Sequence, residues 1–149
     1  MNDKITKKII ILLLLGLCFR FTSMIYIVNG ESMEPSLQHN NMGLAVRTTI
    51  IKPDRFDIVV IRNDNRYLIK RVIGLPGEHI KCEDNLILVD NNILDDKYNG
   101  GVTSNFEYFS NEDEYFCLGD NRRNSSDSRV YGPFTIKDIK AISIFNKGE

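Results

Sequence analysis

The chain has 149 residues, of which 42% are hydrophobic and 26% are charged, and its formal net charge is −1. This length fits one domain, or one small domain with an appendage, and the hydrophobic content is sufficient for a core. The near-neutral balance and a pI of about 6.1 exclude the strongly basic footprint of a nucleic-acid-binding protein, so no nucleic acid is expected as a partner.

The N-terminal segment is the first predicted element. Lys4, Lys7 and Lys8 precede an uncharged run from Ile9 to Phe19, and Arg20 interrupts before the apolar character resumes. The pattern fits an uncleaved membrane anchor over about residues 5–24, a cleaved secretory signal, or a buried helix. An anchor is favoured because "RFTSMIYIV" lacks a small-x-small cleavage site, and because the flanking cations can snorkel to the headgroups.

An anchor of this kind also predicts the orientation of the chain. Its lysine cluster would stay on the cytoplasmic side, by the positive-inside rule. Residues 1–24 would then be the cytoplasmic N-terminus and transmembrane helix, and residues 25–149 a domain outside the lipid bilayer.

The chain after the anchor predicts a mostly β, antiparallel domain. Short β-branched and aromatic runs alternate with turn residues, and no helical period of useful length follows. "DNN" at 90–92 predicts a hairpin, and "LPGE" at 75–78 has the Pro-Gly centre of a type II turn. Residues 99–111 are polar and contain glycine, so we expect a mobile loop there. The expected strands cover residues 43–46, 57–62, 66–73, 79–83, 86–89, 93–94, 115–118 and 139–145.

The three cysteines do not have the spacing of a metal site. Cys18 lies in the apolar run, and Cys82 and Cys117 stand alone. A disulfide between Cys82 and Cys117 is an alternative that depends on a distance the sequence does not establish, and two free thiols are the default interpretation.

A loop of unusual composition, "NGESMEPSL" at 29–37, presents Ser32 between an acid and the apolar Met33. A serine nucleophile needs a proton acceptor within hydrogen-bond reach. The two histidines, His39 and His79, are not placed beside an orienting carboxylate, and no G-x-S-x-G turn surrounds Ser32. A Ser-His-Asp triad is therefore disfavoured.

A lysine in "YLIKRVIG" is the other candidate base. Side chains alternate faces along a strand, so Leu68, Lys70 and Val72 share one face while Arg71 lies on the other. Apolar surroundings lower the pKa of an ammonium group, and a neutral lysine is a competent base. A strand lysine that only snorkels to solvent fits the same pattern.

A polar stretch, "LGDNRRNSSDSRVYG" at 118–132, follows one of the predicted strands. It fits a solvated turn, a cation site, or a scaffold that braces another loop through Asp127 and Arg129. A calcium loop would have more regularly spaced oxygens and a final bidentate glutamate, so no metal is expected.

Three of these stretches, taken in order, resemble the motifs of type I signal peptidases, the bacterial leader peptidases. "GESMEPSL" resembles their S-M-x-P nucleophile box, "YLIKRVIGLPGE" their lysine box, and "GDNRRNSSDSR" their G-D-N-x-x-x-S-x-D-S-R box. The likeness covers about residues 5–145. S-M-x-P alone is a weak signal, but the three boxes in order are highly specific.

The resemblance implies a compact serine endopeptidase with the antiparallel sheets of that family and no cofactor. Such an enzyme is anchored in the plasma membrane and acts on its outer face. It removes signal peptides with small residues at positions −1 and −3 from exported preproteins, by acyl-enzyme catalysis with a Ser–Lys dyad.

The resemblance also assigns roles to residues. Ser32 takes the place of the nucleophile, Lys70 that of the general base, and Ser125 that of a serine whose hydroxyl orients the lysine. The residues matching the structural loop are Asp120, Asp127 and Arg129. The candidates for lining the shallow substrate pockets are Val28, Met33, Leu37, Val60 and Ile69.

The sequence departs from the family pattern at Gly30, where some members carry a serine that helps to bind the oxyanion. Backbone N–H groups are expected to replace that hydroxyl, chiefly the N–H of Ser32 and also that of Gly30. Phe56 replaces a common glycine, and Ser36 a common threonine. Lys70 is not histidine, which separates the chain from the endoplasmic-reticulum and archaeal branch.

Other functions fit parts of the same pattern. An inactive membrane-anchored binding module would keep the fold without the chemistry. A specialised peptidase would process a narrow set of pilin-like or conjugation substrates. The soluble self-cleaving repressors also use Ser–Lys chemistry, but they need a DNA-binding module where this chain has an apolar segment.

Overall fold

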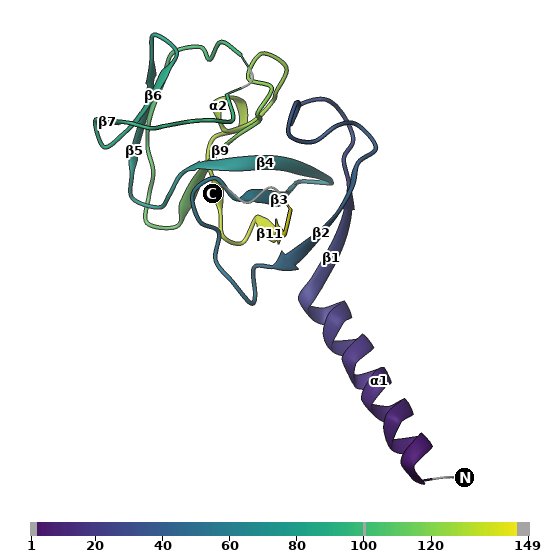
Figure 1. Cartoon of the computed structure of the whole chain (residues 1–149). Coiled ribbons are helices and arrows are strands. Elements are labelled where there is room, and N and C mark those ends of the chain that lie inside the picture. The colour runs from purple at the N-terminus through teal and green to yellow at the C-terminus, as the bar shows by residue number, and fades with distance from the viewer. Residues whose placement is uncertain (1–2, 100, 146–149) are drawn as a thin grey trace.

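The structure, a computed structural model, describes residues 3–99 and 101–145. A long helix, α1 (Asp3–Thr22), projects from a β-rich domain and leads directly into β1 (Ser23–Ile27) (Figure 1). The sequence places the end of the predicted anchor at residue 24, and the helix ends at Thr22. Within the described residues, no helix combines the length and the hydropathy needed to cross a membrane. The outermost residues of the predicted anchor and domain, 1–2 and 146–149, lie outside the described ranges.

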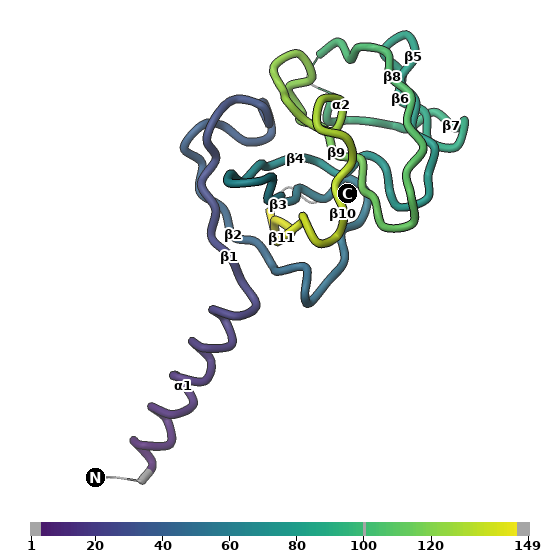
Figure 2. The backbone as a smooth tube through the Cα atoms, turned by 180° about the vertical axis from the view of Figure 1, so that it is seen from behind, coloured from purple at the N-terminus to yellow at the C-terminus, as the bar shows by residue number. Residues whose placement is uncertain are grey.

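Two sheets build the domain, and every strand pair that the structure describes is antiparallel. The larger sheet has the order β1-β2-β11-β3-β4-β9-β10, and the smaller has the order β7-β6-β5-β8. Both views place the smaller sheet on the side of the domain away from α1 (Figures 1 and 2). The strands of the larger sheet after β1 are β2 (Met42–Arg47), β3 (Ile58–Asn63), β4 (Arg66–Gly74), β9 (Glu114–Leu118), β10 (Phe134–Thr135) and β11 (Ile139–Ser143).

The smaller sheet consists of β5 (His79–Glu83), β6 (Leu86–Val89), β7 (Asn92–Ile93) and β8 (Phe106–Phe109). The predicted hairpin joins β6 to β7, because Asp90 and Asn91 have φ angles of 49° and 64°, as a type I′ turn requires. The predicted turn before β5 has Gly77 at φ 80°, the left-handed position of a type II turn. Both turn predictions are confirmed.

The mostly β, antiparallel prediction is also confirmed, and each of the eight expected strands is present within two residues of its predicted limits. Three strands were not predicted: β1, β8 and β10. The mobile loop expected over 99–111 is wrong where β8 pairs with β5, and the ring of Phe106 stacks on Phe116 at 5.1 Å. The polar flanks of "FEYF" hide this short strand in the sequence.

Strand β1 escapes prediction because its residues continue the apolar run of the helix. Its alternation becomes visible only in the sheet, where Tyr26 is buried and Ile25 and Ile27 are exposed. A second helix, α2 (Ser128–Tyr131), is a single turn capped by the Asp127 carboxylate, which accepts from the backbone N–H of Arg129 at 3.2 Å. It follows β9 in the polar stretch singled out above.

Candidate active site

Ser32 lies in the loop that connects β1 to β2. Two backbone hydrogen bonds close this loop at its base. The Val28 N–H donates to the Asn41 carbonyl at 2.8 Å, and the Asn40 N–H donates to the Val28 carbonyl at 2.9 Å. Met33, 1% exposed, packs beneath it in the core with Val28. The loop is thereby fixed on its apolar side, and Ser32 within it is half-buried.

Lys70 reaches this loop from β4, where it pairs with Val59 of β3. Its side chain is buried, with 3% exposure, and its Nζ donates a hydrogen bond to Ser32 Oγ at 2.7 Å. The fold therefore brings together two candidate residues that are 38 positions apart in the chain. This is hydrogen-bond geometry suited to proton transfer between a nucleophile and a base.

Burial lowers the pKa of Lys70 from 10.5 to about 8, because the interior disfavours the charged ammonium. The nearby carboxylates of Asp127 and Asp120 act in the opposite direction, and the charge of Arg129 adds a smaller decrease. At a pKa of about 8, roughly half of the amines are neutral at pH 8, compared with under about 1% for an ordinary lysine.

The polar stretch after β9 forms a loop that holds the backbone of Ser32. Its Asn121 N–H donates to the Ser32 carbonyl at 3.1 Å. Asp127 accepts from the Gly119 N–H at 3.0 Å and from Arg129 Nη2 at 2.8 Å. Burial tends to raise the pKa of Asp127, but these bonds from Arg129 and Gly119 outweigh it and hold that pKa below its ordinary value.

Asp120 forms a buried, two-point ion pair with Arg71, the neighbour of Lys70 on β4. Arg71 Nε and Nη2 donate to the two carboxylate oxygens at 2.9 and 2.7 Å, and both side chains have zero exposure. Asp120 and Asp127 are thus engaged by arginines. Of the three interpretations of this stretch, the contacts support the polar scaffold.

Ser125 lies beside this scaffold. Its Oγ is buried and makes no hydrogen bond of regular geometry among the described residues, although the hydroxyl lies near enough to the Asp127 carboxylate to help lower the pKa of that group. A Cβ at Gly119 would lie 2.2 Å from Ser125 Oγ and 2.5 Å from the Ser32 carbonyl oxygen, so only glycine fits between the two loops. No hydrogen bond between Ser125 and Lys70 is present in the described part of the chain, and an orienting role for Ser125 stays a prediction.

The two backbone N–H groups expected to bind the oxyanion, those of Gly30 and Ser32, differ in whether another group of the protein already accepts their hydrogen bond. Gly30, at φ 106°, donates its N–H to His39 Nδ1 at 3.0 Å. An N–H engaged in this way does not point at a substrate, so the expectation for Gly30 is corrected. Across residues 3–99 and 101–145, no hydrogen bond engages the Ser32 N–H, which is left as the candidate donor.

A cleft of about 280 Å³ opens beside Ser32 and Lys70, between β1 and β4. Four of the predicted pocket residues line it: Val28, Met33, Val60 and Ile69. Leu37 does not; it packs in the core cluster beneath the loop, because its position after the turn points it into the domain. Sequence reasoning missed Asn29 and the exposed Tyr67, which also line the cleft.

The three cysteines are free thiols, so the alternative disulfide between Cys82 and Cys117 is not present. Cys117 is fully buried, and burial raises the pKa of its thiol. It is therefore an uncharged neighbour of the Lys70 amine.

The sequence matches a family model described as signal peptidase, peptidase S26, over residues 3–146. A signal peptidase I S of Bacillus subtilis (strain 168) is 34% identical over 157 residues, covering 93% of this chain and 85% of the relative. A signal peptidase I of Streptococcus pneumoniae serotype 4 is 31% identical, covering 75% of this chain and 76% of the relative.

The fold gives the same result. The crystal structure of a signal peptidase I from Enterococcus faecalis V583 superposes with a TM-score of 0.56 at 28% identity, covering 61% of this chain and 96% of that one. The family match and the relatives each extend over most of the chain. The chain therefore belongs to the signal peptidase I family of serine endopeptidases.

Proposed function

We propose that this signal peptidase cleaves exported preproteins with a Ser32–Lys70 dyad. The observation that carries the proposal is the 2.7 Å hydrogen bond between Lys70 Nζ and Ser32 Oγ in a cleft where burial lowers the pKa of the amine. This contact argues against an inactive binding module, since such a module has no need for a neutral buried lysine beside a serine.

In the proposed reaction, the neutral Lys70 amine takes the proton of Ser32 as Oγ bonds to the carbonyl carbon of the scissile peptide. The Ser32 N–H donates to the oxygen that becomes negative. The Lys70 ammonium then returns the proton to the leaving nitrogen as the C–N bond breaks, and an acyl-enzyme remains. Lys70 next takes a proton from water as the water oxygen bonds to the acyl carbon, and it returns that proton to Ser32 Oγ as the ester C–O bond breaks.

Signal peptides with small side chains at −1 and −3 are the proposed substrates. An extended peptide along β1 and β4 sends alternate side chains into the cleft, whose volume of about 280 Å³ is shared by several positions.

Purified full-length protein should convert a precursor whose signal peptide ends in Ala-x-Ala to the mature form, and it should leave a precursor with Leu at −1 uncut. Equal cleavage of the two precursors contradicts this specificity. Selective cleavage of pilin-like precursors would favour the specialised peptidase.

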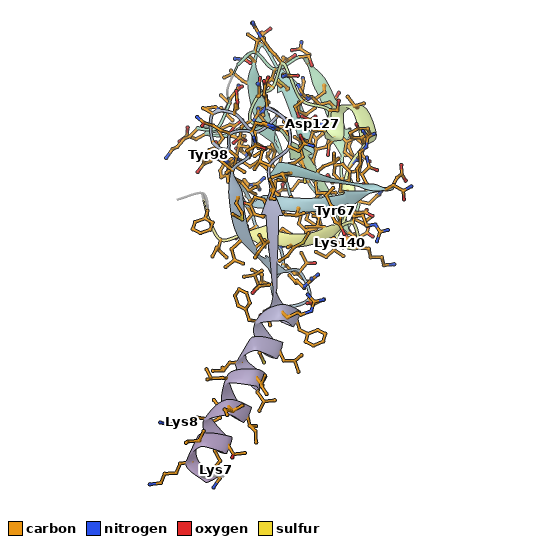
Figure 3. All side chains as sticks on the ribbon, turned by 90° about the vertical axis from the view of Figure 1, so that its right-hand side faces the viewer. Lys7, Lys8, Tyr67, Tyr98, Asp127 and Lys140 are labelled. Carbon is orange, nitrogen blue, oxygen red and sulfur yellow. The ribbon has the colours of Figure 1, made fainter. Side chains whose placement is uncertain are left out.

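The proposal includes the arrangement at the membrane. Residues 1–24 would anchor the chain in the plasma membrane with the N-terminus in the cytoplasm, and residues 25–149 would form the extracytoplasmic peptidase domain. The position of Lys7 and Lys8 at the free end of the helix supports this orientation (Figure 3). Retention in membranes under alkaline extraction measures the anchoring, and release into the supernatant contradicts it.

The dyad predicts how activity depends on pH. The base form of Lys70 is the neutral amine, so the rate should rise with pH through about 8 and reach a plateau well below 10. At pH 7 about a tenth of the plateau rate is expected, because about a tenth of the amines are neutral there. The measurement is a pH–rate profile of the purified protein on a peptide substrate. A rising limb near pH 10 would show that Lys70 is not a desolvated base.

A further inference from the structure

A segment outside the three motifs, residues 94–99 between β7 and β8, contacts the scaffold of the site. It leaves the smaller sheet after the Leu94 N–H donates to the Ile87 carbonyl at 2.8 Å. Tyr98 on this segment and Asp127 on the scaffold both lie in the upper part of the domain, away from the helix with Lys7 and Lys8 (Figure 3). The segment makes two contacts with buried arginines.

The first contact is an ion pair between Asp96 and Arg122. Arg122 Nη2 lies 2.6 Å from the Asp96 Oδ2, and the two side chains are 0% and 6% exposed. From this position Arg122 Nε donates to the Gly119 carbonyl at 2.9 Å. The Arg122 carbonyl in turn accepts from Arg129 Nη2 at 2.8 Å. Asp96 therefore supplies the buried carboxylate that pairs with the Arg122 guanidinium, and Arg122 in turn is hydrogen-bonded to Gly119 and Arg129 of the loop.

The same loop holds the Ser32 backbone. Besides the bond from the Asn121 N–H to the Ser32 carbonyl, the Asn121 side-chain amide donates to the Glu31 carbonyl at 3.2 Å. Gly119 approaches the Ser32 carbonyl so closely that it has no room for a side chain. A displacement of residues 119–122 is consequently transmitted to Ser32.

The second contact reaches the strand that carries Lys70. The ring of Tyr98 covers the Arg71 guanidinium, with 3.6 Å between Cζ and the ring centroid. Tyr98 also packs against Phe56, whose carbonyl accepts from Arg71 Nη1 at 2.8 Å. The 94–99 segment thus touches the neighbour of Lys70 on one side and the loop that holds Ser32 on the other.

We propose that Asp96 is a positioning residue of the peptidase reaction, acting through Arg122 on the loop that sets Ser32 against Lys70. The inference rests on the proposed Ser32–Lys70 function. Without the carboxylate, Arg122 is a buried charge with no compensating partner and moves toward water. The Gly119 carbonyl then loses its donor and the loop shifts. A misplacement of about 1 Å at the reacting atoms can cost about 100-fold in rate.

The test compares Asp96→Asn with Asp95→Asn in the full-length protein. Asp95 is the matched control, since its side chain is 86% exposed and lies 4.0 Å from Lys97. In the folded fraction, measured by circular dichroism, Asp96→Asn should lower kcat about 10- to 100-fold and change KM less than about two-fold. Asp95→Asn should match the wild type, and Asp96→Glu should recover part of the loss.

A second variant covers the case in which Asp96→Asn does not fold. Asp96→Leu/Arg122→Met removes both charges, which avoids the uncompensated arginine, but it still deprives the Gly119 carbonyl of its donor. Its kcat is expected to stay low. Wild-type kcat in folded protein of either variant overturns the inference and limits Asp96 to stability. If the wild type itself does not cleave, the proposed function fails, which is a distinct result.

Discussion

Replacing Ser32 or Lys70 with alanine is expected to reduce preprotein cleavage about 10⁴-fold or more while the protein stays folded. Nucleophile and base act as a unit, so either loss removes nearly all of the covalent pathway, and the double variant should be no slower than the single ones. The 2.7 Å hydrogen bond between the two side chains makes this coupling direct. The measurement is the rate of conversion of a preprotein by purified variants.

Two controls separate this effect from general damage. Ser126→Ala and Lys52→Ala replace exposed residues of the same types and should leave the rate unchanged. Circular dichroism should be the same for all variants, because neither side chain of the dyad belongs to a hydrophobic core cluster of the described residues. Substantial processing by purified Ser32→Ala protein would refute the assignment of the nucleophile.

Replacing Asp120 with asparagine is expected to lower the free energy of unfolding by about 3–5 kcal/mol, because it leaves Arg71 charged and buried. Both side chains of this pair have zero exposure. Arg71 also donates to the Phe56 carbonyl at 2.8 Å, but a carbonyl oxygen carries no formal charge that could balance a guanidinium. Urea unfolding of the full-length variant measures the loss.

A double-mutant cycle with Arg71→Met identifies the cause. When both partners are replaced, no unpaired charge remains, so the double variant should be less destabilised than the sum of the single ones. The exposed Asp113→Asn should unfold like the wild type. Additive losses in the cycle would show that the ion pair is not the source of the effect.

The sequence by itself determined the class of the domain, its family and the two residues proposed for catalysis. Local patterns carry this information, because a strand shows its period over four to eight residues and each motif is contiguous. Lys70 could be singled out within "YLIKRVIG" because alternation places apolar neighbours on its own face. The polar stretch with Asp127 and Arg129 could be singled out from the sequence, but the choice among a solvated turn, a cation site and a scaffold needed the contacts of the folded chain, such as the pair between Arg129 Nη2 and Asp127 Oδ2 at 2.8 Å.

Only the tertiary structure decided which groups meet across the chain. Gly30 gives its N–H to His39, Leu37 turns into the core, and β8 forms in a stretch that looks like a loop. Asp96 gives no local signal at all, since its importance comes from Arg122, 26 positions away. Such contacts depend on how the two sheets pack and on which buried charge needs a partner, and no local pattern in the sequence records either.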